Sequence, residues 1–188
     1  RICHMLSALR SFWIIGMFMG LPALAAALQE NWENGYKDAD VTGAHVLGYW
    51  NFESKEALSL LGAILRSSGG RFGAGLESFP GMPIEDKRHA ALTEPKMDKL
   101  SPKGAFTLEM WVKPKPEFTP ELRCYLLDKK YVDHTDYQWQ ISEADKLGLR
   151  RLSVTLGFGA ESRLIHSDPV KLEPNVWKHL AFSYDGVG

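Results

Sequence analysis

Residues 106–113 read F-T-L-E-M-W-V-K and are followed by Pro114. The even-numbered positions are apolar, and three of the four odd-numbered positions are polar or charged. This period of two is typical of a β-strand that turns one face toward a core. Pro114 and Pro116 lack the backbone N–H that a strand ladder needs, so we expect the strand to end there.

The segments after residue 114 also read as short strands separated by turns. They are rich in aromatic or β-branched residues and are bounded by Asp, Gly, Pro or Asn. Strands at this density with almost no helix predict an all-β fold, a two-sheet antiparallel sandwich. The predicted strands after the first one are 123–128, 137–141, 151–158 and 177–184.

The region before residue 106 is less regular. Residues 45–53 (H-V-L-G-Y-W-N-F-E) carry apolar side chains on both faces, which predicts a strand covered on both sides. Residues 54–68 have helical spacing of apolar positions, and we expect a short helix or loop that leads into a strand near 63–66. Glycines between 69 and 75 predict tight turns, and residues 79–101 predict a long surface excursion with at most short strands.

The N-terminus is predicted to be a targeting segment. Arg10 precedes the apolar run 12–21, Pro22 interrupts that run, and Ala25-Ala26-Ala27 fits a small-residue cleavage site. We therefore expect a signal peptide at 1–27, a polar linker at 28–43 and one domain at 44–188. The protein is expected to be secreted or at the cell surface, in a periplasmic or extracellular location, with no membrane span after cleavage. An uncleaved signal-anchor is the alternative.

Composition excludes some partners. The 188 residues are 45% hydrophobic and 24% charged, with a net charge of −1, which is typical of a globular protein and gives no electrostatic basis for nucleic-acid binding. Basic residues form only short clusters such as Lys129-Lys130, expected at solvated edges. After cleavage Cys124 is the only thiol, expected to be a half-buried small hydrophobe rather than a reactive group.

Four motifs resemble those of laminin-G-like domains of the concanavalin A-like lectin/glucanase superfamily. They are G-Y-W-N-F-E (48–53), G-R-F-G-A-G-L (70–76), F-T-L-E-M-W-V-K-P (106–114) and N-V-W-K-H-L-A-F-S-Y-D-G (175–186). The resemblance covers residues 44–188 and implies a jelly roll of two antiparallel sheets. Such domains continue beyond the Asp185-Gly186 turn, so the resemblance implies a jelly roll incomplete at the C-terminus.

Catalytic motifs are missing from the sequence. Laminarinase-type relatives need three spaced acidic residues, but here Glu143 and Asp145 are followed by Gly148 at the third position. The histidines have no metal-binding spacing, and no nucleophile elbow, P-loop or dinucleotide glycine pattern occurs. We expect a protein that is not an enzyme.

Binding residues are expected on strand faces. Trp111 and Glu109 project opposite the apolar face of their strand, while Gln138 and Gln140 share a face and bracket Trp139. Sugar rings stack on aromatic side chains, and amides or carboxylates hydrogen-bond their hydroxyls. The four residues are therefore predicted ligand-binding residues. A tryptophan in a sandwich strand is more often part of the core, and that alternative stays open for Trp111.

A structural calcium ion is common in domains of the resembled family. The resemblance implies Glu53, just after the first predicted strand, as a calcium ligand. The functional hypothesis is an exported, non-catalytic module that binds a glycan or an extracellular protein. The alternatives are an accessory domain of a larger extracellular carbohydrate-active enzyme and a structural or adhesive spacer.

Overall fold

The computed structural model describes residues 33–54, 58–78, 89–92, 97–129 and 134–187. The chain divides into two compact units, residues 1–46 and 47–188. The predicted signal peptide at 1–27 and the first part of the predicted linker lie outside the described residues. In the remainder of the linker, α2 (Ala39–Thr42) forms one helical turn, in which the Thr42 hydroxyl donates to the Asp38 carbonyl at 2.9 Å.

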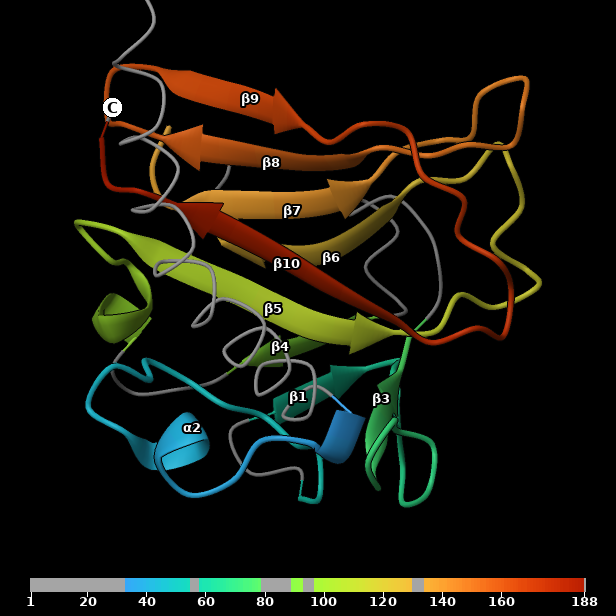
Figure 1. Cartoon of the computed structure of the whole chain (residues 1–188), viewed down its shortest axis with the longest axis horizontal. Coiled ribbons are helices and arrows are strands. Elements are labelled where there is room, and N and C mark those ends of the chain that lie inside the picture. The colour runs from blue at the N-terminus through green and yellow to red at the C-terminus, as the bar shows by residue number, and fades with distance from the viewer. Residues whose placement is uncertain (1–32, 55–57, 79–88, 93–96, 130–133, 188) are drawn as a thin grey trace, which may run out of the picture. The chain divides into compact units, whose positions relative to one another are not determined.

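The unit from residue 47 onward is built mainly from antiparallel strands (Figure 1). Helix among the described residues of the chain is limited to α2, residues 33–34 and the 3-10 turn η2 (Met97–Leu100). The strands are β1 Leu58–Leu61, β2 Ile64–Arg66, β3 Gly75–Glu77, β4 His89–Leu92, β5 Phe106–Val112, β6 Cys124–Lys129, β7 Tyr137–Ile141, β8 Leu152–Gly157, β9 Ser162–His166 and β10 Lys178–Tyr184.

Residues Phe106–Val112 form β5, as predicted. It pairs antiparallel with β10 over its full length, from Phe106 opposite Tyr184 to Val112 opposite Lys178. Because directly opposed residues share a face, the apolar positions of β5 and β10 line one side of this pair. Thr107, Glu109 and Trp111 line the other side, opposite Ser183, Ala181 and His179.

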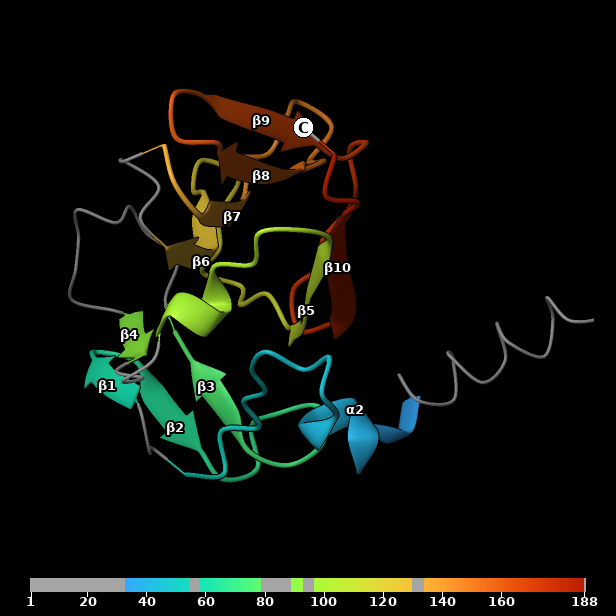
Figure 2. The same cartoon turned by 90° about the vertical axis from the view of Figure 1, so that its left-hand side faces the viewer.

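A four-stranded antiparallel sheet has the order β6-β7-β8-β9 (Figure 1). Strands β6, β7 and β8 coincide with the predicted segments to within one residue. Strand β9 was not predicted, because all five of its side chains are exposed and its sequence S-R-L-I-H has no buried alternation. Two smaller pairs, β1 with β4 and β2 with β3, complete the described strands (Figure 2).

One hydrophobic cluster contains residues of both larger sheets. Its buried members include Trp139 of β7, which is 1% exposed, Val154 and Leu156 of β8, and Leu180 of β10. The inward side chains of β5, including Leu108, pack against them. The apolar faces of β5 and β10 and of β7 and β8 therefore meet in a common core.

The predicted strand at 45–53 is wrong. The chain turns at its start, where the Val46 N–H donates to the Gly43 carbonyl at 2.9 Å. At its end, Phe52 has a φ of 61°, and the Asn51 side chain accepts from the Glu53 N–H at 3.1 Å. A left-handed residue cannot continue an extended strand, so these apolar side chains lie on irregular backbone.

The short helix or loop predicted before the strand near 63–66 is also wrong for residues 58–61, which form a strand. Leu58–Leu61 form β1, and Gly62, with a φ of 91°, separates β1 from β2. A glycine in this conformation interrupts a right-handed helix. The predicted strand near 63–66 is confirmed as β2, where Leu65 stands opposite Leu76 of β3.

Candidate functional site

Gln138 and Gln140 lie on one face of β7 and Trp139 points the other way, as predicted; the structure places Trp139 in the core. Their cross-strand partners are Thr155 and Ser153 on β8. On the other side, β6 places its own residues opposite both glutamines. We call this side of the sheet the glutamine face; it comprises Tyr125, Asp128, Gln138, Gln140, Ser153 and Thr155.

The two glutamines carry buried polar atoms that lack partners. Gln138 is 4% exposed, and its Nε2 has no hydrogen-bond partner among the described residues; the same is true of Oε1 of the partly buried Gln140. Leaving such a group unpaired costs about 1–3 kcal/mol. The glutamine face thus holds one unpartnered donor and one unpartnered acceptor two residues apart on β7, both covered from solvent.

The surroundings of the glutamines are polar with one aromatic ring. Partly buried Tyr125 stands opposite Gln140, and the Arg123 guanidinium lies 5.8 Å from the centre of its ring. Ser153 is buried, and its hydroxyl and His166 Nδ1 are 2.8 Å apart. A face with amides, hydroxyls and a tyrosine has the chemistry that hydroxyl-rich ligands require.

Glu109 and Trp111 lie on the other strand pair. The outward side of β5 and β10 is here called the tryptophan face. In it, His179 Nε2 is 3.3 Å from Glu109 Oε2 and its ring centre is 5.1 Å from that of Trp111. Farther along the face, the hydroxyl groups of Thr107 and Ser183 are hydrogen-bonded at 2.9 Å.

Groups of the same chain surround the Trp111 ring. Phe72 meets it edge-on with ring centres 5.7 Å apart, and the Arg71 guanidinium lies 5.3 Å from its centre. Trp111 is partly buried, and its Nε1 is buried without a partner among the described residues. Packing of this kind is typical of a structural tryptophan and leaves less of the ring for a sugar to stack on.

The predicted ligand-binding residues therefore form two pairs. The inward faces of β5 and β7 both contribute to the shared core. Since successive side chains of a strand point to opposite sides, Glu109 and Trp111 point away from that core on β5, and Gln138 and Gln140 do so on β7. The structure brings the members of each pair together but does not join the two pairs in one site.

Glu53, the predicted calcium ligand, takes part in a loop. Its Oε1 accepts a hydrogen bond from the Ala74 N–H at 3.1 Å, beside Gly73, whose φ is 135°. No group of three or more potential metal-ligating His, Cys, Asp or Glu side chains occurs in the described part of the chain. The observed contact shows how Glu53 holds the glycine-rich turn.

The segment with Glu143 and Asp145 is a turn between β7 and β8. Asp145 Oδ1 accepts hydrogen bonds from the N–H groups of Leu147 and Leu149 at 2.8 and 2.9 Å. Gly148, at the position where an acidic residue would be needed, has a φ of 75°. The Asp145 carboxylate thus closes a loop.

Arg150 has a structural role that was not predicted from the sequence. It is 5% exposed, and its guanidinium donates to the carbonyls of Leu122, Ser142, Phe118 and Thr119 at 2.7, 2.8, 3.2 and 2.7 Å. It also lies 3.8 Å from the centre of the Phe118 ring. Burial lowers the pKa of Arg150 below its ordinary value. Arg150 fastens the loop before β6 to the end of β7, and no local sequence pattern indicates this.

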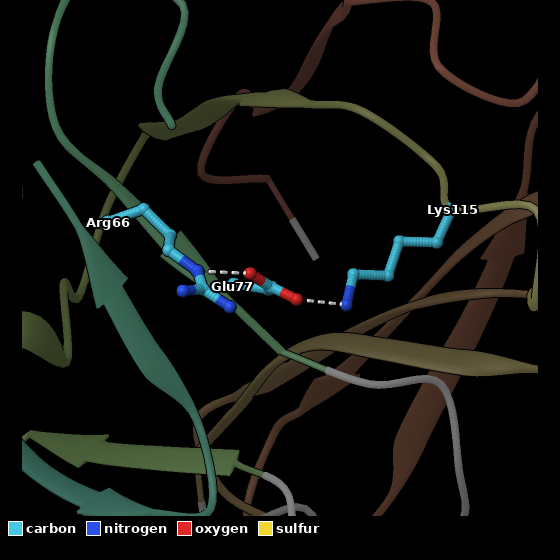
Figure 3. A network of polar contacts seen from close by, with 3 residues as sticks. All are labelled: Arg66, Glu77 and Lys115. Atoms are coloured by element: carbon cyan, nitrogen blue, oxygen red, sulfur yellow. Dashed lines mark hydrogen bonds and ion pairs between the residues drawn. The ribbon is translucent and has the colours of Figure 1, made fainter. Parts of the chain in front are cut away.

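Glu77 forms a second missed network (Figure 3). Its two carboxylate oxygens bind Lys115, which follows β5, and Arg66 of β2, the latter at 2.5 Å. Hydrogen bonds from Lys115 and then Arg66 lower the pKa of Glu77 to about 2. The network ties the β2–β3 pair to the end of the central strand.

Lys129 is not at a solvated edge, contrary to expectation. Its Nζ lies 2.9 Å from Asp136 Oδ2 and 2.6 Å from Ser101 Oγ, with the Lys129 and Asp136 side chains only 11% and 9% exposed. Lysine burial is tolerated because the charge is paired.

The cysteine and the buried tyrosine both have suppressed acidity. Burial raises the pKa of Cys124 to about 11, so the thiolate that reacts or binds metal is disfavoured. Burial also raises the pKa of Tyr137 to about 12, and its hydroxyl donates to the Leu100 carbonyl at 2.8 Å. Both groups are structural in this setting.

Comparison with protein-family models, with curated proteins and with solved structures found no match for this chain. Within the described residues, the helices are all too short or too polar to cross a membrane.

Proposed function

We propose that this chain is an exported, non-catalytic module that binds glycans through its glutamine face. The observation that carries the proposal is the pair of buried, unpartnered amide atoms, Gln138 Nε2 and Gln140 Oε1. A sugar hydroxyl both donates and accepts hydrogen bonds, so a glycan that displaces the groups covering the two amides would satisfy both atoms. The Tyr125 ring beside Gln140 adds an apolar surface for a sugar ring.

The finer fold proposed with this function is a laminin-G-like jelly-roll sandwich. The shared cluster of β5, β7, β8 and β10 supports two layers packed face to face. In that arrangement the glutamine face and the tryptophan face are the two outer surfaces. Glu109 and Trp111 are then a second, weaker candidate for ligand contact.

The direct test is glycan-array binding by the wild type and by Gln140→Leu. The variant should lose binding while its free energy of unfolding stays equal or rises by about 1–3 kcal/mol, because a buried unpaired acceptor is removed. Glu161→Gln, at an exposed carboxylate outside both faces, is the matched control and should bind as the wild type does. Loss of binding in Glu109→Gln but not in Gln140→Leu would contradict the glutamine-face assignment.

The same array experiment distinguishes two other proposed functions. An extracellular protein ligand would use the same face and would be found with a secreted-protein array instead. A structural spacer is favoured by the covering of Trp111 by Phe72 and Arg71. If it is correct, neither array gives a signal and Trp111→Ala mainly lowers stability.

A structural calcium ion at Glu53 is also proposed. The support is the position of its carboxylate beside the glycine turn at Gly73. Calcium should raise the unfolding temperature of the wild type relative to a chelator and should not do so in Glu53→Gln. An equal unfolding temperature of the wild type with calcium and with the chelator would contradict the site.

A further inference from the structure

One row of side chains crosses the glutamine face and continues onto β9. Ser153 of β8 stands opposite Gln140 of β7 on one side and opposite His166 of β9 on the other. Ser153 is 2% exposed, whereas His166 is exposed on the last strand of the sheet. The row therefore joins the covered acceptor Gln140 Oε1 to a titratable ring that solvent reaches.

The Ser153 hydroxyl has one proton and two acceptors beside it. Its Oγ lies 2.8 Å from His166 Nδ1, while Gln140 Oε1 has no hydrogen-bond partner among the described residues. The Cβ atoms of directly opposed residues are about 4.5–5.5 Å apart, so rotation of the two side chains brings the hydroxyl within reach of the amide oxygen. The neutral tautomer of histidine with its proton on Nε2 leaves Nδ1 as an acceptor, and the Ser153 hydroxyl then donates to it.

Protonation of His166 reverses this hydrogen bond. Both ring nitrogens of a charged histidine are donors, so Nδ1–H donates to Ser153 Oγ and the hydroxyl proton turns to another acceptor. Gln140 Oε1 is the unpartnered acceptor in the same row. The Ser153 hydroxyl then satisfies the atom that a glycan is proposed to bind.

We propose that His166 is a positioning residue of the glutamine face: while its ring is neutral, it holds the Ser153 hydroxyl away from Gln140 Oε1 and keeps that acceptor unpartnered for the ligand. This inference rests on the function proposed above and adds its regulation by pH. A histidine gains its charge as pH falls from about 8 to about 5. Glycan binding therefore weakens over this range by about three- to tenfold, the effect of one neutral hydrogen bond.

Two charged residues lie beside this row. Arg151 precedes β8, and its guanidinium donates to the Ser167 carbonyl at 2.7 Å, while Asp168 follows β9. A direct effect of charge on Gln140, from these residues or from His166, does not need the Ser153 hydroxyl. Removal of that hydroxyl therefore separates the proposed rearrangement from simple electrostatics.

The test is a nuclear magnetic resonance pH titration of the full chain in the absence of glycan. In the wild type, the Gln140 side-chain amide signal should shift with the same midpoint as the His166 ring signals. The shift should be lost in Ser153→Ala, which has no hydroxyl. It should also be lost in His166→Gln, whose amide oxygen accepts from the Ser153 hydroxyl but gains no charge.

His134→Gln is the matched control. His134 Nδ1 is likewise 2.8 Å from a serine hydroxyl, that of Ser162, but the cross-strand partner of Ser162 is Gly157 and no amide follows in the row. In His134→Gln the Gln140 amide signal should titrate as in the wild type. A Gln140 signal that does not follow the His166 titration, or that still follows it in Ser153→Ala, would overturn the inference.

Glycan-array binding at neutral pH and at about pH 5 separates failure of this inference from failure of the proposed function. The wild type should bind more weakly at the lower pH, and Ser153→Ala should bind equally at both. Wild-type binding that is equal at both values would contradict the regulation. An absence of binding at either pH would contradict the proposed function, and the glycan-free titration would still decide the role of His166.

Discussion

At the scale of single residues, the ionisation of Glu77 is expected to control stability in acid. Its pKa in the folded protein is about 2, below its ordinary value of 4.5. A group with a lowered folded pKa stabilises the protein fully above its ordinary pKa, and that contribution is lost as pH falls toward the folded pKa. Urea unfolding should therefore show Glu77→Gln to be less stable than the wild type at neutral pH.

This difference between Glu77→Gln and the wild type should shrink between pH 4.5 and pH 2. Glu161→Gln is the control, because its ion pair with Arg163 is exposed and 3.8 Å long. The control should match the wild type at every pH. A gap between Glu77→Gln and the wild type that persists unchanged at the acid end would contradict the role of the network.

Arg150 should tolerate no other cation. In Arg150→Lys, one ammonium cannot reach the four carbonyls that the guanidinium binds. We expect the free energy of unfolding to fall by about 3 kcal/mol or more, because buried carbonyls lose a charged donor. Arg151→Lys, at the exposed neighbouring position, should change it by less than about 1 kcal/mol. Equal effects of the two substitutions would contradict this account.

The sequence alone could not predict that Arg150 and Glu77 each bind several groups from distant parts of the chain. Their partners lie up to 32 residues away for Arg150 and 38 for Glu77, so the contacts depend on how loops meet after the sheets form. Gln138 and Gln140 could be predicted, because strand alternation alone fixes which side chains share a face.

At the scale of elements, β8 ends where another segment crosses it closely. A Cβ on Gly157 would meet the backbone of His134 at 2.2 Å and of Thr135 at 2.3 Å. Gly157→Ala should therefore lower the free energy of unfolding by about 1–3 kcal/mol, since backbone must shift. Gly104→Ala has open space around the added atom and should be neutral in the same thermal or urea unfolding experiment.

Regular alternation determined which elements could be predicted. Strands β5 and β10 alternate between covered and exposed positions along part of their length, so their period is visible in the sequence; β7 is covered on both faces and is recognised by its apolar residues at every second position. The segment 45–53 has equally apolar residues, but the left-handed Phe52 removes it from the strands. Strand β9 buries nothing, so its sequence carries no period to find.

At the scale of the whole unit, one core should make the two larger sheets unfold together. Leu180 of β10 is buried in the cluster that holds Trp139 of β7. Leu180→Ala should cost about 2–5 kcal/mol, and the loss should be seen equally by tryptophan fluorescence and by the far-ultraviolet circular dichroism of the sheets. Two separate transitions would show that the sheets do not share a cooperative core.

The candidate site was predicted only in part, because its location depends on how the strands of the whole unit pack together. Because side chains alternate between the two faces of a strand, Glu109 shares a face with Trp111 on β5, and Gln138 shares a face with Gln140 on β7. This alternation does not say which faces of different strands meet. The shared core answers that question, since it uses the inward faces of β5 and β7 and leaves the two predicted pairs on separate surfaces.

A nuclear magnetic resonance titration that follows the side-chain amide signals of Gln138 and Gln140 tests whether the glutamine face is the ligand site. The probe is the oligosaccharide that binds best on the glycan array. Both amide signals should shift on titration, with saturation at the same concentration, while the Trp111 indole signal stays in place. Unshifted glutamine amides in the presence of a bound oligosaccharide would contradict the glutamine face as the ligand site.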